Sequence, residues 1–131
     1  MTSIRVRIYH CDSYGHVNNA RYLEFLEEAR WQWLQPAIDS GAIDTSKYSF
    51  VLVNLNINYR SPLVAGDFAD ITVGNLHFGN ASMKLEQVIM NRTTGKMAST
   101  AEVTFVILEN ASGRPVPMRE EWKEVLNGLS S

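Results

Sequence analysis

The sequence predicts an α+β domain in which an antiparallel sheet of five strands, or slightly more, wraps around one long helix. Two patterns lead to this fold class. Short segments in which apolar and polar residues alternate occupy most of the chain, as in half-buried strands. One long segment instead has apolar residues at every third or fourth position, as in a helix. Because this segment lies between the first and second alternating segments, the later strands are expected to fold over it.

The length of 131 residues corresponds to a single domain, residues 1–131. Its net charge of -2 and lack of a basic run disfavour nucleic acid as a partner. We expect neither a secretory leader nor a membrane span, because residues 1–8 carry two arginines among alternating apolar residues and no apolar stretch approaches the length of a span. We therefore expect a cytoplasmic protein without membrane insertion, and the single cysteine, Cys11, fits a reducing compartment.

The first alternating segment begins near the N-terminus. Ile4, Val6 and Ile8 alternate with polar residues and predict a first strand. Residues 10–19 interrupt the alternation, because they are rich in turn formers and too polar for a core element. We interpret them as a loop.

A long helix is predicted from Ala20 onward by apolar residues three or four positions apart. Asn18 or Asn19 is expected to cap its N-terminus, and Pro36 to end or kink it near Gln35. Its many aromatic residues predict a central helix that is covered on most sides.

Four more alternating segments follow one another through short turns, which predicts an antiparallel meander: residues 50–59, 68–76, 82–91 and 97–108. In the first of them, the row predicted to be buried is Val51, Val53, Leu55, Ile57 and Tyr59. The segment 115–129 predicts a short C-terminal helix.

The side chains that can perform chemistry gather in the loop before the long helix: Asp12, His16, Asn18 and Asn19. A helix N-terminus presents unpaired N–H groups that can stabilise a carbonyl oxygen as it becomes negative. A carboxylate a few residues upstream can attack a carbonyl or activate water. Together they suffice for acyl transfer, and Gly15 permits the turn and a close approach of ligand. Caps and turns use the same residue types, so spacing alone does not establish an active site.

No metal site or cofactor is expected. His10, Cys11, Asp12 and His16 lack the spacing of a zinc site, and neighbours in an extended segment point to opposite sides. His77 has no partner in the sequence and is interpreted as an ordinary strand or turn residue. The glycine-rich signatures of nucleoside triphosphate and dinucleotide binding are absent from the sequence.

The run from Asp12 to Arg30, DSYGHVNNARYLEFLEEAR, resembles the D-x-x-G-H-V-N-N-x-x-Y signature of hotdog-fold acyl-CoA thioesterases of the 4-hydroxybenzoyl-CoA thioesterase type. Similar sequence segments at residues 53–60 and 104–106 extend the resemblance over nearly the whole chain. The resemblance implies a hotdog fold and a hydrolase of acyl-CoA thioesters in fatty acid metabolism. It favours medium to long fatty acyl chains over aromatic acyl groups.

The resemblance also implies roles for individual residues. Asp12 corresponds to the nucleophile or general base, and the backbone N–H of Asn19 to the oxyanion donor. His16, Asn18 and Tyr22 match positions that orient the thioester or water. The choice between an acyl-enzyme anhydride and direct attack by water stays open.

Substrate-binding residues are expected at Gly15, Val17, Tyr22, Phe25, Arg60 and Ser82. Many relatives carry a basic residue before the serine that corresponds to Ser82, where it can meet coenzyme A phosphates, whereas this chain has Gly79-Asn80-Ala81. The contact of that basic residue with coenzyme A is therefore not expected in this chain. Arg60, Lys84 and Arg92 are the alternative cations that could meet the phosphates. A tunnel for the acyl chain is expected to use Phe25, Trp31, Trp33 and Phe50, unless these residues only pack the core.

The resemblance implies a homodimer joined edge to edge, and possibly a homotetramer, with each site shared between two subunits. A non-catalytic acyl-CoA-binding hotdog protein and a thioesterase for aromatic acyl-CoA are the alternatives. A hotdog dehydratase would need a histidine paired with an acid, and none of the three histidines shows that arrangement.

Overall fold

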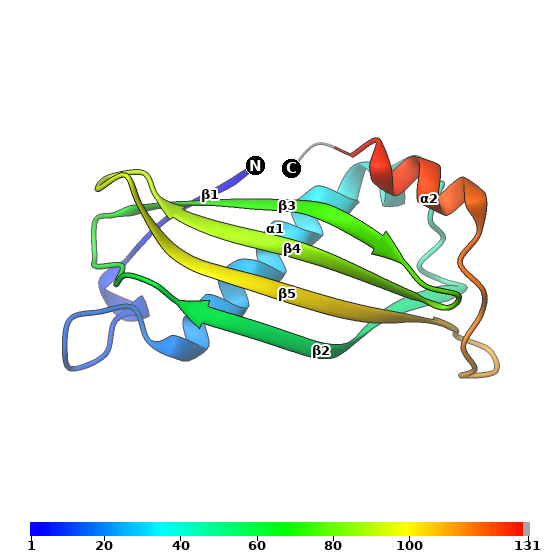
Figure 1. Cartoon of the computed structure of the whole chain (residues 1–131), viewed down its shortest axis with the longest axis horizontal. Helices are drawn as coiled ribbons and strands as arrows, with labels where there is room; N and C mark the ends of the chain where they lie inside the picture. The colour runs from blue at the N-terminus through cyan, green and yellow to red at the C-terminus, as the bar shows by residue number, and fades with distance from the viewer. Residues whose placement is uncertain (130–131) are drawn as a thin grey trace.

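The computed structural model describes residues 1–129, which form a five-stranded antiparallel sheet with one long helix against its face (Figure 1). The elements in chain order are β1 (Thr2–Arg5), a 3-10 helix (Ile8–His10), α1 (Asn19–Asp39), β2 (Tyr48–Tyr59), β3 (Phe68–Phe78), β4 (Ser82–Asn91), β5 (Lys96–Glu109) and α2 (Glu120–Asn127). The predicted fold class, a five-stranded antiparallel sheet curled over one long helix, is confirmed.

The strand order is β1-β3-β4-β5-β2. β3, β4 and β5 form the predicted meander, but β2 pairs with β5 and not with β3, so the prediction of a four-stranded meander was wrong for β2. The pairing runs from Tyr48 opposite Glu109 to Tyr59 opposite Ser99, which gives β2 a partner along its whole length. As a result β2 is an edge strand, with one side unpaired within residues 1–129.

β1 is shorter than the sequence predicted. It ends at Arg5, and the chain turns into the 3-10 helix, which leaves the Ile8 side chain 83% exposed. Val6 is buried nevertheless, and its N–H donates to the carbonyl of Asp67 (2.9 Å). This turn directs the chain toward the loop that precedes α1.

α1 runs through Pro36 to Asp39, so the prediction that it ends or kinks near Gln35 was wrong. A proline in a helix removes one intrahelical hydrogen bond. Here the last turn is retained because Ala37 is buried and its carbonyl accepts from the N–H of the equally buried Ile43 (3.1 Å).

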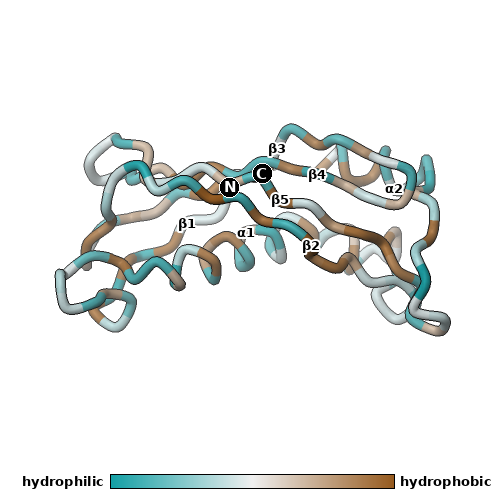
Figure 2. Tube along the Cα trace, turned by 60° about the horizontal axis from the view of Figure 1, so that its bottom comes forward, coloured by the Kyte–Doolittle hydropathy of each residue, from teal (hydrophilic) through white to brown (hydrophobic). Residues whose placement is uncertain are grey.

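α1 lies along one face of the sheet (Figure 2), where it packs against β1 and β3. Leu26, Ala29 and Trp33 face the buried core, whereas Leu23 and Trp31 are 43% and 49% exposed. The helix is therefore not covered on most sides in the single chain, contrary to the prediction. None of the helices within residues 1–129 is both long and apolar enough to span a membrane.

Candidate functional site

The loop before α1 is held by its own backbone. Cys11 and Val17 face each other in an isolated antiparallel bridge, the N–H of Asp12 donates to the carbonyl of His16 (2.9 Å), and that of Gly15 donates to the carbonyl of Asp12 (3.0 Å). Gly15 has φ 79°, a conformation that glycine adopts without strain. The local sequence therefore specifies this loop, as predicted.

The Asp12 carboxylate lies on the surface of the loop. One oxygen, Oδ1, accepts the N–H of Tyr14 (2.9 Å), which fixes the side chain. Within residues 1–129 the other oxygen has no hydrogen-bond partner. Asp12 is thus oriented and still has an oxygen available to a substrate or a water.

The N-terminus of α1 follows directly. Asn18 is the N-cap: its Oδ1 accepts the N–H of Ala20 (3.0 Å), and its carbonyl accepts the N–H of Arg21 (2.8 Å). The N–H of Asn18 itself donates to the carbonyl of His10 (2.9 Å). The N–H groups of Asn18, Ala20 and Arg21 thus all have acceptors, whereas the N–H of Asn19 has no partner in the described part of the chain. It is available to an anionic oxygen, and the helix dipole favours negative charge there.

Two tyrosines connect the end of β2 to this helix N-terminus. The Tyr59 hydroxyl donates to the carbonyl of Asn19 (3.2 Å), and its ring meets the ring of Tyr22 edge-on, with centroids 5.0 Å apart. Tyr22 is buried, and burial raises the pKa of its hydroxyl. β2 is thereby fixed at the entrance to the site.

A buried histidine supports the loop from behind. His10 Nδ1 accepts the N–H of Arg7 (2.8 Å), and the ring packs edge-on against Phe25 at 5.0 Å. Burial lowers the pKa of the His10 imidazole, and the positive charge of Arg21 lowers it further. The neutral ring is the form that fits, because a protonated Nδ1 cannot accept a hydrogen bond.

This pKa shift predicts a loss of stability in acid. The unfolded chain takes up a proton near the ordinary histidine pKa of about 6.5, whereas the folded chain does so only at lower pH. The contribution of His10 is therefore complete above pH 6.5 and is lost as the pH falls below it. Thermal unfolding from pH 7 to pH 5 should show a shallower pH dependence for His10→Asn than for wild type. His77→Asn, at an exposed strand position, is the control, and equal slopes for wild type and His10→Asn would contradict the prediction.

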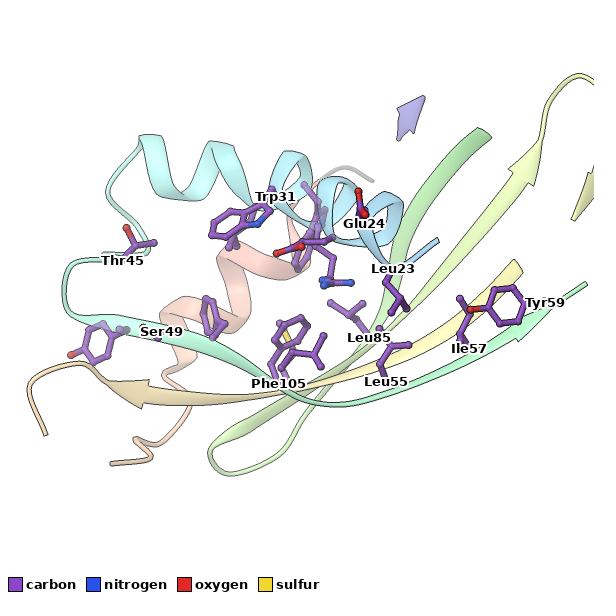
Figure 3. A pocket seen from close by; sticks show the side chains of 18 residues that line it. Leu23, Glu24, Trp31, Thr45, Ser49, Leu55, Ile57, Tyr59, Leu85 and Phe105 are labelled. Carbon is purple, nitrogen blue, oxygen red and sulfur yellow. The ribbon is translucent and has the colours of Figure 1, made fainter. Parts of the chain in front are cut away.

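A groove of about 910 Å³ lies between α1 and the β2 side of the sheet. Its walls are mostly apolar, and Figure 3 shows Thr45 and Ser49 at one end with Ile57 and Tyr59 at the other. The lining from the helix includes Leu23, Glu24, Glu27, Arg30, Trp31, Trp33 and Leu34, and that from the sheet includes Tyr48, Phe50, Leu52, Leu55, Tyr59, Leu85 and Phe105. The end at Tyr59 is the end at the N-terminus of α1.

A β-bulge in β2 decides which residues face this groove. The pairing with β5 shifts between Leu52 and Asn54, so Val53 has no partner in the register. An extra residue reverses the alternation of faces. The groove is therefore lined by Phe50 and Leu52 before the bulge and by Leu55, Ile57 and Tyr59 after it, whereas Val51 and Val53 are not among its lining residues. The row predicted to be buried was wrong at Val51, Val53 and Tyr59, which are 38%, 56% and 46% exposed, whereas Leu55 and Ile57 are half-buried.

Asn18 and Asn19 open α1 directly after the loop that carries Asp12, and Tyr22 is buried near the start of the same helix. His16 is exposed beside them and forms an isolated bridge with Val64. Val17 and Phe25, predicted to bind substrate, are buried in the core, and Phe25 is not among the groove residues. Trp31, Trp33 and Phe50 do line the groove.

The predicted coenzyme A contacts are spread over the molecule. Arg60 directly follows Tyr59 at the groove end near α1. Ser82 begins β4 at the opposite end of the sheet, near α2 (Figure 1). Met83 lines the groove, so the alternation places the adjacent Ser82 on the other face. Lys84 pairs with Glu102 on that face (3.4 Å).

The single chain thus separates Asp12 from Ser82. In residues 1–129 no three histidine, cysteine, aspartate or glutamate side chains gather closely enough to hold a metal ion.

Four groove residues were not predicted from the sequence: Arg30, Glu27, Tyr48 and Leu52. Arg30 and Glu27 follow Glu24 at intervals of three along α1, and this spacing was a signal that they share one face.

The profile of the thioesterase-like superfamily matches residues 6–126. The chain belongs to this superfamily. Long-chain acyl-CoA thioesterase FadM of Escherichia coli is 42% identical over 128 residues, which cover 98% of this chain and 97% of FadM. The fold is that of hotdog thioesterases, and the prediction of a thioester hydrolase is confirmed.

Solved structures agree with the thioesterase-like family. YbaW, a probable thioesterase from Escherichia coli, superposes with a TM-score of 0.84 at 37% identity and covers 99% of this chain and 98% of its own. A thioesterase from Thermus thermophilus, solved with coenzyme A and zinc, has a TM-score of 0.74 at 28% identity, with 97% and 93% of the two chains covered.

Proposed function

We propose that this thioesterase hydrolyses medium- to long-chain fatty acyl-CoA to the free acid and coenzyme A. The observation that carries the proposal is the course of the groove, which begins at the N-terminus of α1, where Tyr59 binds the carbonyl of Asn19. A thioester carbonyl placed there lies beside the unpaired N–H of Asn19 and the loop of Asp12. Its acyl chain then extends along an apolar groove, which agrees with the long-chain substrate in the name of FadM.

In this proposal the Asn19 N–H donates to the carbonyl oxygen as it becomes an oxyanion. Asp12 either attacks the carbonyl carbon, which expels the thiolate of coenzyme A and forms an anhydride that water hydrolyses, or it removes a proton from an attacking water. Asn18 positions Asn19 by capping the helix, and the exposed His16 orients the thioester or water. The same two groups, carboxylate and amide, serve either route.

The phosphates of coenzyme A are proposed to meet Arg60. Arg92 is engaged by Asp70 (3.0 Å) and Lys84 by Glu102, whereas Arg60 has no ion pair within the described residues. Arg60 is also next to Tyr59, at the groove end where the thioester is placed. The Thermus relative shows that a protein of this fold binds coenzyme A.

The length of the acyl chain is proposed to be limited by Tyr48 at the other end of the groove. Its ring packs edge-on against Trp122 (4.8 Å) and under the Arg119 guanidinium (5.1 Å), and its hydroxyl accepts from Arg119. These contacts from α2 and the residue before it fix the ring in place.

Removing this wall should extend the substrate range. For Tyr48→Ala we expect the ratio of kcat/KM for palmitoyl-CoA to that for octanoyl-CoA to rise about tenfold, because several more methylenes become buried. Tyr48→Phe retains the ring and should leave the ratio unchanged. Equal ratios in Tyr48→Ala and wild type would show that the chain ends elsewhere.

The functional unit is proposed to be a homodimer joined through β2. An unpaired edge strand with exposed apolar side chains is a template for pairing with another chain, and Val51, Leu52 and Val53 are 38%, 40% and 56% exposed. Antiparallel pairing of two β2 strands places the Asp12 end of one copy against the Ser82 end of the other. Each site would then combine two subunits. A homotetramer and a cytoplasmic location stay predictions.

A thiol-release assay tests the proposed activity directly. Acyl-CoA esters from acetyl to palmitoyl, together with benzoyl-CoA, are compared by kcat/KM. We expect a maximum among the medium to long fatty chains. A maximum on benzoyl-CoA would support an aromatic substrate, and no hydrolysis of any ester would support a non-catalytic binding protein.

A further inference from the structure

One cation lies in the wall of the otherwise mostly apolar groove. Arg30 is half-buried, its Nη1 donates to Gln87 Oε1 (3.0 Å), and its guanidinium lies 5.5 Å from the centre of the Phe105 ring. Gln87 is itself fixed, because it is buried and its Nε2 donates to the carbonyl of Leu26 (3.0 Å). The structure therefore holds the guanidinium in a defined place. Burial lowers the pKa of Arg30, and the negative charge of nearby Glu27 partly opposes this shift.

The guanidinium is poorly satisfied by the chain itself. It has five N–H donors, and the bond to Gln87 uses one of them. Within residues 1–129 no carboxylate lies close enough to form an ion pair with it. A plain alkyl chain in the groove would displace water from the remaining donors without replacing the lost hydrogen bonds, which is costly for a charged group. A ligand with an oxygen at this position avoids that cost.

Glu27 indicates which oxygen group fits. It lines the same groove one helical turn before Arg30 and has no ion pair in the described residues, whereas Glu24 is engaged by Arg21 (3.0 Å). The site therefore offers a donor and an acceptor. A hydroxyl group can accept from Arg30 and donate to Glu27, whereas a keto group or a carboxylate can only accept from Arg30 and leaves Glu27 without a donor.

The position along α1 places this oxygen far from the thioester. Arg30 lies eleven residues after Asn19, which corresponds to about 16 Å along a helix. The side chain slants back toward the helix N-terminus, so its tip is somewhat nearer. A substituent on the carbons next to the thioester would still lie beyond its reach.

We infer that the groove selects acyl chains that carry a hydroxyl group remote from the thioester, with Arg30 donating to that hydroxyl and Glu27 accepting from it. This inference rests on the proposed acyl-CoA hydrolysis and adds a substrate class to it. Arg30 is a specificity-determining residue and takes no part in bond cleavage.

The test compares three esters of one chain length: stearoyl-CoA, 3-hydroxystearoyl-CoA and 12-hydroxystearoyl-CoA. We expect wild-type kcat/KM to be about tenfold higher for the 12-hydroxy ester than for the other two. Its hydroxyl group can form hydrogen bonds with the charged side chains of Arg30 and Glu27, and bonds to charged groups have an effect of this size. Arg30→Met should reduce this ratio to about one, and the ratio is the readout because Arg30 itself lines the groove. Arg114→Met removes an exposed arginine outside the groove and should keep the wild-type ratio.

The outcomes separate this inference from the proposed function. Absence of hydrolysis of all three esters would overturn both. Hydrolysis of stearoyl-CoA with a wild-type ratio near one would overturn the inference alone. If Arg30→Met fails to fold, the wild-type enzyme still tests the inference. Its kcat/KM for the 12-hydroxy ester is then compared with its kcat/KM for the 3-hydroxy ester and for stearoyl-CoA. Arg30 would instead contact a second copy of the chain if two results came together. The wild-type enzyme would show no preference for the 12-hydroxy ester, and Arg30→Met would fold but remain monomeric.

Discussion

Asp12→Asn is expected to lower kcat/KM for a fatty acyl-CoA by about 10²-fold or more, the effect of losing a positioned base or nucleophile. The fold should be unchanged. The carboxylate accepts the N–H of Tyr14 through Oδ1, and the amide oxygen of asparagine can accept the same bond. The substitution therefore removes the charge and the nucleophile while the loop keeps its shape. Thiol release measures the effect, and circular dichroism and thermal unfolding verify the fold.

Asp44→Asn provides a matched control. Asp44 is also an exposed loop aspartate whose Oδ1 accepts a backbone N–H two residues on, from Ser46 (3.0 Å), but it lies between α1 and β2. This variant should retain wild-type activity. Wild-type turnover in Asp12→Asn would exclude Asp12 as base or nucleophile, and an equal loss in Asp44→Asn would indicate a nonspecific effect of the substitution.

Val53→Asp is expected to weaken the proposed dimer and to lower activity with it. Val53 is the bulged residue of the edge strand, and its side chain is 56% exposed, so an aspartate is tolerated in the isolated chain. In a dimer joined through β2, two added carboxylates would approach each other across the interface. Like charges in such a position cost several kcal/mol, which corresponds to about 10²-fold or more in the dissociation constant.

Analytical ultracentrifugation over a range of concentrations measures this effect, and thiol release at the same concentrations shows whether activity follows association. Val53→Thr retains the shape and β-branching of valine without a charge and should remain dimeric. A Val53→Asp variant that is as dimeric and as active as wild type would place the interface elsewhere.

The loop and the helix N-terminus were predictable because their interactions are local. The turn at Gly15 and the cap at Asn18 bond to residues only a few positions away. The strands were predictable for the same reason, since alternation is a property of neighbours. Errors arose where distant parts of the chain compete, as at Pro36, where the packing of Ala37 and Ile43 retains the last helical turn.

Residue patterns along the chain were enough to predict one long helix with five strands, and a carboxylate in the loop that precedes the helix N-terminus. The pairing of β2 with β5 at the edge of the sheet and the bulge at Val53, which leaves Leu52 facing the groove, became visible only in the folded chain. The same holds for the contacts of Arg30 with Gln87 and Phe105, residues more than fifty positions away. Strand order and register depend on the free energy of pairing between distant segments. The alternation of apolar and polar residues along one segment does not show which other segment it pairs with.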